Sequence, residues 1–199
     1  MNYITNYETL ISHGYQTERK VALECLNAAL DAASTYEGTK RVIRCDSEAI
    51  YAGERRIPYS ELDHVYVVGA GKGTFPIVKA LDEILGDRID GGVVALKEIT
   101  EQLRNPKLEL IHAAHPVPDE RSLEAGEKIA KLADSLTERD LVLACITGGC
   151  SSLMVLPPDG IPFSDIRELG GGADEMRGSH QRDEHDPQAY LPDQGRRTA

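Results

Sequence analysis

Apolar and polar positions follow one another along this chain with two different periods, and each period predicts a different element. The run from Val65 to Val68 is short, β-branched and aromatic, which is typical of a buried strand. After it, apolar residues recur three and four positions apart, as on one face of a helix. These residues are Ile77, Val78, Ala80, Leu81, Ile84 and Leu85. We therefore expect a strand followed closely by a helix.

The same two patterns predict the remaining elements. Apolar spacing after Thr17, a candidate N-cap, indicates a helix through residue 33, and a second helix is expected over 123–133. Strands are expected at 41–45, 92–96, 108–113 and 141–146, and residues 53–60 are expected to form a turn-rich connection. Strands that alternate with helical segments favour an α/β fold with a mostly parallel sheet covered by helices on both faces.

Charge and cysteine usage exclude several classes of protein. The 199 residues carry a formal net charge of -11, so we expect no nucleic-acid or membrane-surface partner. The longest apolar run, 141–146, is too short to cross a bilayer, and residues 1–12 lack the pattern of a signal peptide. No pair or cluster has metal-binding spacing among the four cysteines, Cys25, Cys45, Cys145 and Cys150. We expect reduced thiols in a cytoplasmic protein.

A glycine turn follows the strand at 65–68 and is the first candidate for chemistry. Gly69, Gly71 and Gly73 allow a sharp turn into the helix, where unpaired N–H groups and the helix dipole favour an anion. Lys72 lies inside this turn and is able to reach a phosphate or carboxylate. The stretch is neither a Walker A loop, because Gly73 follows Lys72, nor a full dinucleotide fingerprint, because Pro76 replaces the third glycine. A tight turn with a solvent-facing lysine remains an alternative.

Two further loops carry candidate site residues. Hydroxyls and open backbone at 147–152 suit phosphate or carboxylate binding, through Thr147, Gly148, Gly149, Ser151 and Ser152. The alternative is an ordinary turn with serine helix caps, and Cys150 is expected to pack rather than to react. Loop 115–120 offers His115, Asp119 and Glu120 for base or metal-positioning roles. The alternative has both carboxylates complementing the start of the helix near Ser122. His64 and His112 lie in strands and are expected only to pack.

The three motifs, taken in order, resemble a known family. Val-Val-Gly-Ala-Gly-Lys-Gly (67–73), His-Pro-Val-Pro-Asp-Glu (115–120) and Ile-Thr-Gly-Gly-Cys-Ser-Ser-Leu (146–153) are similar to the N-terminal domain of glycerate 2-kinases that carry a C-terminal leucine-rich (MOFRL) domain. Arg44-Cys-Asp46 also fits, and the resemblance covers about residues 17–167. It implies a large Rossmann-like domain and a smaller C-terminal domain, with the active site between them.

The resemblance also implies an activity and residue roles. The reaction would transfer the γ-phosphoryl group of ATP to the 2-hydroxyl of D-glycerate, with Mg²⁺ or another divalent cation whose ligands stay unassigned. Lys72 would stabilise charge on the transferring phosphoryl or the glycerate carboxylate. Gly69, Gly71 and Gly73, with Gly148, Gly149, Ser151 and Ser152, would line the nucleotide-phosphate pocket. His115 and Asp119 would lie near the substrate. Cys150 stands where many relatives carry glycine or serine.

The sequence changes character near residue 168. Residues 169–190 show almost no apolar periodicity, which is typical of a disordered segment. Read one base later, codons for residues 180–191 allow the string INEMNTIRKHIS, which follows the family's own order. We therefore expect an incomplete kinase domain over 1–167 and an aberrant tail over 168–199, produced by a frameshift. A chain truncated in this way would have little or no activity, and a genuine divergent tail is the alternative.

Two other functions stay open. The Gly-x-Gly turn permits an oxidoreductase of the hydroxypyruvate reductase type, although Lys97-Glu98 is a poor version of the acidic ribose-binding signal. A non-enzymatic phosphosugar-binding α/β domain is the second alternative. The exposed surface of an incomplete domain favours association, so a homo-oligomer is possible.

Overall fold

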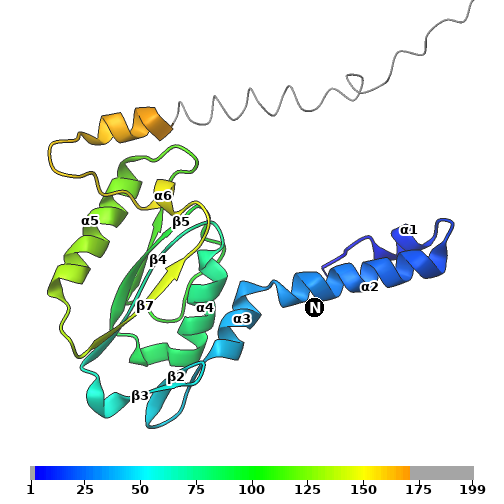
Figure 1. Ribbon diagram of the computed structural model, residues 1–199, viewed down its shortest axis with the longest axis horizontal. Helices are drawn as coiled ribbons and strands as arrows, with labels where there is room; N and C mark the ends of the chain where they lie inside the picture. The colour runs from blue at the N-terminus through cyan, green and yellow to red at the C-terminus, as the bar shows by residue number, and fades with distance from the viewer. Residues whose placement is uncertain (1–2, 171–199) are drawn as a thin grey trace, which may run out of the picture.

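The computed structural model describes residues 3–170, and its core is a four-stranded parallel sheet (Figure 1). The strand order is β6-β5-β4-β7, with neighbours in parallel register, for example Val68 beside Val93 and beside Ala144. The strands are β4 (His64–Ala70), β5 (Gly91–Leu96), β6 (Leu108–His112) and β7 (Asp140–Ile146). The predicted α/β fold with a Rossmann-like sheet is confirmed.

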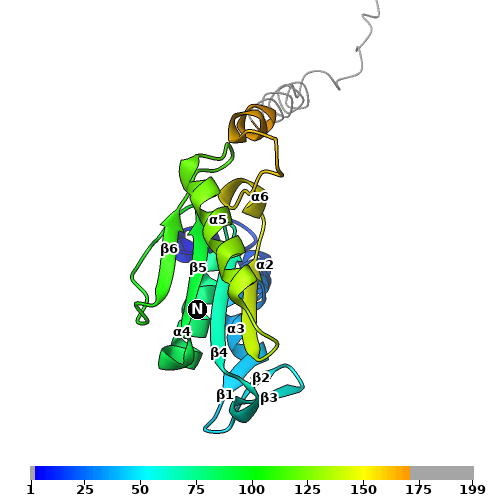
Figure 2. The same ribbon diagram turned by 90° about the vertical axis from the view of Figure 1, so that its left-hand side faces the viewer.

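Helices cover both faces of this sheet. Figures 1 and 2 show α4 (Thr74–Leu85) and α5 (Glu120–Ser135) on opposite sides. Along β5 the side chains alternate between the two layers, because successive residues of a strand point to opposite faces. Val94 and Leu96 belong to the cluster that contains α4, whereas Val93 and Ala95 belong to the cluster that contains Ala125 of α5. Strand β5 therefore contributes side chains to the hydrophobic clusters on both faces of the sheet.

Short elements complete the described chain. A second, antiparallel sheet has the order β1-β2-β3, and its strands are β1 (Ile43–Cys45), β2 (Ala49–Ala52) and β3 (Arg55–Pro58). The short helices are α3 (Thr35–Val42), α6 (Cys150–Leu153) and the 3-10 turns η1 (Tyr59–Glu61) and η2 (Gly86–Arg88). A helical segment also runs over 163–170. It includes the first three residues of the predicted tail, and residues 171–199 lie outside the described part.

The N-terminal helices stand apart from the sheet. Helix α1 (Tyr7–Ile11) packs on α2 (Gln16–Ala32), which extends away from the α/β body in Figure 1. Neither helix contains a buried residue, and Leu26 of α2 is 50% exposed. The predicted helix is present, but its N-cap prediction was wrong. Tyr15 occupies that position without a capping side chain, and Thr17 lies in the first turn.

Two predictions between residues 41 and 60 were wrong in part. The expected strand over 41–45 begins only at Ile43, because Arg41 and Val42 end helix α3. The expected connection over 53–60 contains strand β3, which forms a hairpin with β2. Gly53, with a φ of 60°, makes the turn of this hairpin. Arg55 and Arg56 masked the strand pattern because β3 is an exposed edge strand with charged side chains.

Candidate functional site at the switch point of the sheet

The candidate site lies where the strand order of the parallel sheet reverses. From β4, the chain continues to β5 and β6 on one side, and β7 then pairs with the other side of β4. In open α/β sheets, ligands bind outside the carboxyl ends of the strands at such a switch point. The glycine turn follows β4 and the Gly-Gly-Cys-Ser-Ser loop follows β7. Both loops therefore lie at this position.

Hydrogen bonds from two backbone amides join these two loops. The amide of Lys72 donates to the carbonyl oxygen of Gly148 at 2.9 Å, and the amide of Gly73 donates to Thr147 Oγ1 at 3.0 Å. Gly71 has a φ of 139°, and a Cβ built on it would lie 2.0 Å from Thr147 Oγ1. Only glycine fits this approach, since both the backbone conformation and the space exclude a side chain.

The third predicted loop reaches the same place. A Cβ built on Gly149 would lie 2.8 Å from Nε2 of His115 and 3.2 Å from Cγ of Lys72. Gly149 also has a φ of 89°, a left-handed conformation that favours glycine. The peptide between His115 and Pro116 is cis. Lys72, His115 and Gly149 therefore meet, although they are far apart in the sequence.

The amides of the first glycine turn are already occupied. Besides the bonds of Lys72 and Gly73, the Gly71 amide donates to the carbonyl oxygen of Ala95. Gly69 lies inside β4, where a Cβ would come within 2.7 Å of the Cys145 carbonyl oxygen. These glycines serve close packing of β4, β7 and α4. The expected anion cradle of bare amides is therefore not available in the turn itself.

Free donors instead surround the second loop. Within residues 3–170, the amides of Gly148, Gly149 and Ser151 have no protein acceptor. The hydroxyls of Ser151 and Ser152, the ammonium of Lys72 and the imidazole of His115 likewise have no hydrogen-bond or ion-pair partner in this part of the chain. Lys72 and Ser151 are exposed. A loop with several free donors beside an exposed lysine is suited to an anion.

Asp119 is committed to the protein itself. It is the N-cap of α5, and its carboxylate accepts hydrogen bonds from the amides of Arg121, Ser122 and Ala114 and from the Arg121 guanidinium. Burial by itself would raise the pKa of this carboxyl, but the bonds from Arg121, Ala114 and Ser122 outweigh burial and lower the pKa. Because Ala114 precedes His115, Asp119 fixes the base of the His-Pro loop rather than facing the other loops.

Sequence reasoning missed the role of Thr74 and was wrong about two histidines. Thr74 is fully buried, and its hydroxyl donates to the Cys145 carbonyl oxygen and shares a hydrogen bond with Thr147 Oγ1. A threonine directly after the last glycine of the turn was the available signal. His112 does not simply pack, because it is exposed and its Nδ1 accepts a hydrogen bond from the Arg121 guanidinium. His64 is also exposed and pairs with Asp140 at 2.8 Å.

Residues 3–170 contain neither a metal-binding cluster nor a membrane-spanning helix. Between residues 3 and 170, no group of three or more His, Cys, Asp or Glu side chains is arranged to hold a metal ion. No helix in this range is long and apolar enough to cross a membrane. All four cysteines are free thiols.

Comparison with protein families gives one match that covers most of the chain. Residues 21–171 match the family described as "Domain of unknown function (DUF4147)". The chain belongs to this family. The match includes all three loops of the candidate site and begins within α2.

Individual relatives carry names of two kinds. The chain is 34% identical over 131 residues to the D-glycerate 2-kinase of Thermotoga maritima, covering 64% of this chain and 31% of that protein. It is 37% identical over 103 residues to a putative hydroxypyruvate reductase of Agrobacterium vitis, covering 52% of this chain and 26% of that protein. The crystal structure of glycerate kinase from Thermotoga maritima superposes with a TM-score of 0.62 at 30% identity, over 77% of this chain and 34% of that one. The chain spans about a third of the length of the kinases it matches.

Proposed function

We propose that this chain carries the phosphate-binding part of a glycerate 2-kinase, an enzyme that phosphorylates D-glycerate on its 2-hydroxyl with ATP. One observation supports this proposal more than any other. At the switch point of the sheet, the side chains of an unpaired lysine and an unpaired histidine lie beside Gly149, in a loop whose amide and hydroxyl donors are free. Phosphoryl transfer depends mainly on positioning and on neutralising charge, and these groups supply both.

Each group has a distinct role in this proposal. The Lys72 ammonium neutralises charge on the transferring phosphoryl group or on the glycerate carboxylate. The amides of Gly148, Gly149 and Ser151 and the hydroxyls of Ser151 and Ser152 donate hydrogen bonds to phosphate oxygens. His115, whose ring lies beside Gly149, would contact the substrate hydroxyl. Asp119 positions the loop that carries His115, and Gly69, Gly71 and Gly73 allow the two strands and α4 to approach closely.

The donor set fits a nucleotide phosphate better than it fits a metal ion. ATP, when bound, supplies the phosphoryl group, and the donors described above are complementary to its anionic oxygens. For Mg²⁺ we expect carboxylate ligands, but the described residues hold no such cluster and Asp119 is already committed. We therefore assign no step of the reaction to a metal held by residues 3–170.

In this proposal, the second wall of the active site is formed by the part of the relatives' length that this chain does not match. We propose that this wall is the C-terminal leucine-rich (MOFRL) domain together with a segment lost through a frameshift near residue 168. Sequencing of the gene tests the frameshift. The account expects codons that yield the family's string in the next reading frame, and codons unable to do so would refute it. Without this wall, water would not be excluded from the phosphoryl group, so a chain that lacks the wall should have little or no turnover.

The activity itself is tested in a chain whose reading frame has been restored. With ATP and D-glycerate, the account expects 2-phosphoglycerate as the product. Oxidation of a reduced nicotinamide cofactor with hydroxypyruvate, without phosphoryl transfer, would support the oxidoreductase alternative that the Agrobacterium relative's name suggests. The occupied amides of the first glycine turn argue against this alternative, because a dinucleotide pyrophosphate needs them free. Binding of phosphosugars without any turnover would favour a non-enzymatic domain.

A further inference from the structure

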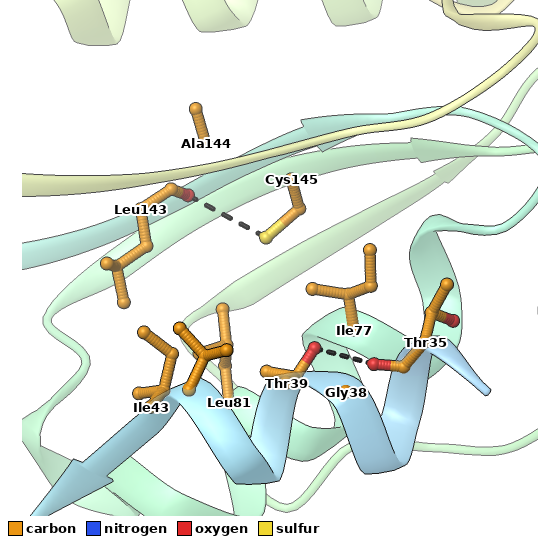
Figure 3. Close-up of a pocket in the computed structure, with 10 residues that line it drawn as sticks. Thr35, Gly38, Thr39, Ile43, Ile77, Leu81, Leu143, Ala144 and Cys145 are labelled. Carbon is orange, nitrogen blue, oxygen red and sulfur yellow. Dashed lines mark hydrogen bonds between the residues drawn. The ribbon is translucent and has the colours of Figure 1, made fainter. Parts of the chain in front are cut away.

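A series of hydrogen bonds through two threonine hydroxyls links the first glycine turn to β7. The Gly73 amide donates to Thr147 Oγ1 at 3.0 Å, and this oxygen lies 3.0 Å from Thr74 Oγ1. Thr74 Oγ1 in turn lies 3.2 Å from the carbonyl oxygen of Cys145 in β7. Figure 3 shows the side chain of this cysteine pointing from β7 toward α4, the helix that begins with Thr74. The series therefore crosses the contact between α4 and β7.

The groups at its two ends fix the direction of this series. A hydroxyl has one proton to donate, an amide N–H only donates, and a carbonyl oxygen only accepts. Because Thr74 gives its proton to the Cys145 carbonyl oxygen, the proton between the two threonines comes from Thr147. Thr147 thus accepts from Gly73 and donates to Thr74, and its hydroxyl has no proton left for a ligand. In this respect it differs from the serine hydroxyls of the same loop, which are free within residues 3–170.

The same threonines lie on both sides of the Lys72 backbone. Thr74 follows Lys72 by two residues, and Thr147 directly precedes Gly148, whose carbonyl oxygen accepts the Lys72 amide at 2.9 Å. Two successive amides of the glycine turn are therefore held by two successive residues of the second loop. Cγ of Lys72 lies 3.2 Å from the place that a Cβ on Gly149 would take. A change in this junction would therefore carry the ammonium group away from the free donors.

We propose that Thr147 is a positioning residue, whose hydroxyl holds the glycine turn where Lys72 reaches the donors of the second loop. Thr74 keeps this hydroxyl turned away from the ligand, so Thr147 itself makes no contact with ATP. The inference rests on the proposed function, because it takes the Lys72 ammonium as the group that binds phosphate. A threonine that only stabilised the fold, or one that bound phosphate itself, would give different results in the experiments below.

The first test is calorimetric titration of ATP into the 199-residue chain and its threonine variants, each shown to be folded by circular dichroism. Thr147→Val has nearly the same shape without the hydroxyl, and we expect ATP to bind it at least about fivefold more weakly. Thr147→Ser keeps the hydroxyl and should stay within about twofold of the unaltered chain. The control is Thr39→Val in α3, which removes a hydroxyl that donates to the Thr35 carbonyl oxygen at 2.7 Å (Figure 3). It should leave the affinity for ATP unchanged.

A double-mutant cycle separates positioning from the other two roles. If Thr147 acts through Lys72, then Thr147→Val should weaken ATP binding by less than about twofold in the Lys72→Met background. A hydroxyl that binds phosphate directly, or a general loosening of the fold, would lower the affinity by the same factor in both backgrounds. Such an equal effect would overturn the proposal.

A second measurement applies even where Thr147→Val does not fold. In NMR spectra of the unaltered chain, the Thr147 hydroxyl proton should exchange with water slowly enough to be observed, and saturating ATP should leave it in place. Absence of this signal, with or without ATP, would overturn the proposal. If ATP does not bind the unaltered chain, the proposed function fails and the positioning role fails with it. ATP binding that Thr147→Val leaves unchanged would refute the positioning role alone.

Discussion

The backbone amide of Lys72 donates a hydrogen bond of 2.9 Å to the carbonyl oxygen of Gly148, and this bond joins the two glycine loops at the switch point of the sheet. As a consequence, the lysine side chain leaves the first loop beside the second, where Gly148, Gly149 and Ser151 keep their amides free. The first loop therefore supplies the charge and the second supplies the hydrogen-bond donors. This division of roles is the basis of the predictions below.

Gly71 is predicted to tolerate no side chain. In Gly71→Ala the new Cβ would lie 2.0 Å from Thr147 Oγ1, and its φ of 139° is strained for any other residue. We expect a loss of about 3 kcal/mol in the free energy of unfolding, measured by urea denaturation. Gly148→Ala is the matched control, because a Cβ there meets nothing within 4 Å, and its change should stay within about 0.5 kcal/mol. Equal stability of the two variants would contradict the described junction of the loops.

Gly126 should behave in the opposite way from an ordinary helical glycine. Replacing glycine by alanine within a helix normally adds roughly 0.5 to 1 kcal/mol of stability, and Gly38→Ala in α3 should show this gain. In α5, however, a Cβ on Gly126 would lie 2.0 Å from the Val155 carbonyl oxygen. We expect Gly126→Ala to lose about 2 kcal/mol instead. Thermal denaturation of both variants measures the sign, and a gain at both positions would show that α5 does not pack so closely on residue 155.

Asp119 should make stability depend on pH. Its pKa is lowered in the folded chain, so its contribution is present above the ordinary aspartate value of 3.8 and is lost as the pH falls below that value. At pH 7 we expect Asp119→Asn to cost about 1 kcal/mol, because the carboxylate caps α5 and pairs with Arg121. The difference from the unaltered chain should shrink below pH 4 in urea denaturation.

The control for this experiment is Asp134→Asn, at an exposed position near the end of the same helix. It should change stability little at either pH. A cost of Asp119→Asn that is the same at pH 3 and pH 7 would mean that the charge of the carboxylate does not stabilise the helix terminus.

Much of the sheet could be predicted because its strands are continuous apolar runs, as at Val65 to Val68, and because α4 and α5 have regular apolar spacing. Strand β3 could not be predicted, since its charged residues lie on an edge where packing does not select apolar side chains. The three loops lie at one edge of the sheet because each follows a strand of the parallel sheet, β4, β6 or β7. Which amides are free depends on hydrogen bonds between loops about 75 residues apart, such as Gly73 to Thr147, and local sequence does not contain that information.

The central claim is that Lys72 and the donors of the second glycine loop bind a nucleotide phosphate. The most direct test is calorimetric titration of ATP into the 199-residue chain, into Lys72→Met and into Lys131→Met, whose lysine is exposed on α5. The account predicts that ATP binds the unaltered chain, that Lys72→Met weakens binding at least about tenfold, and that Lys131→Met changes it less than about twofold. Equal affinity of Lys72→Met and the unaltered chain, or no binding of ATP by the unaltered chain, would contradict the account.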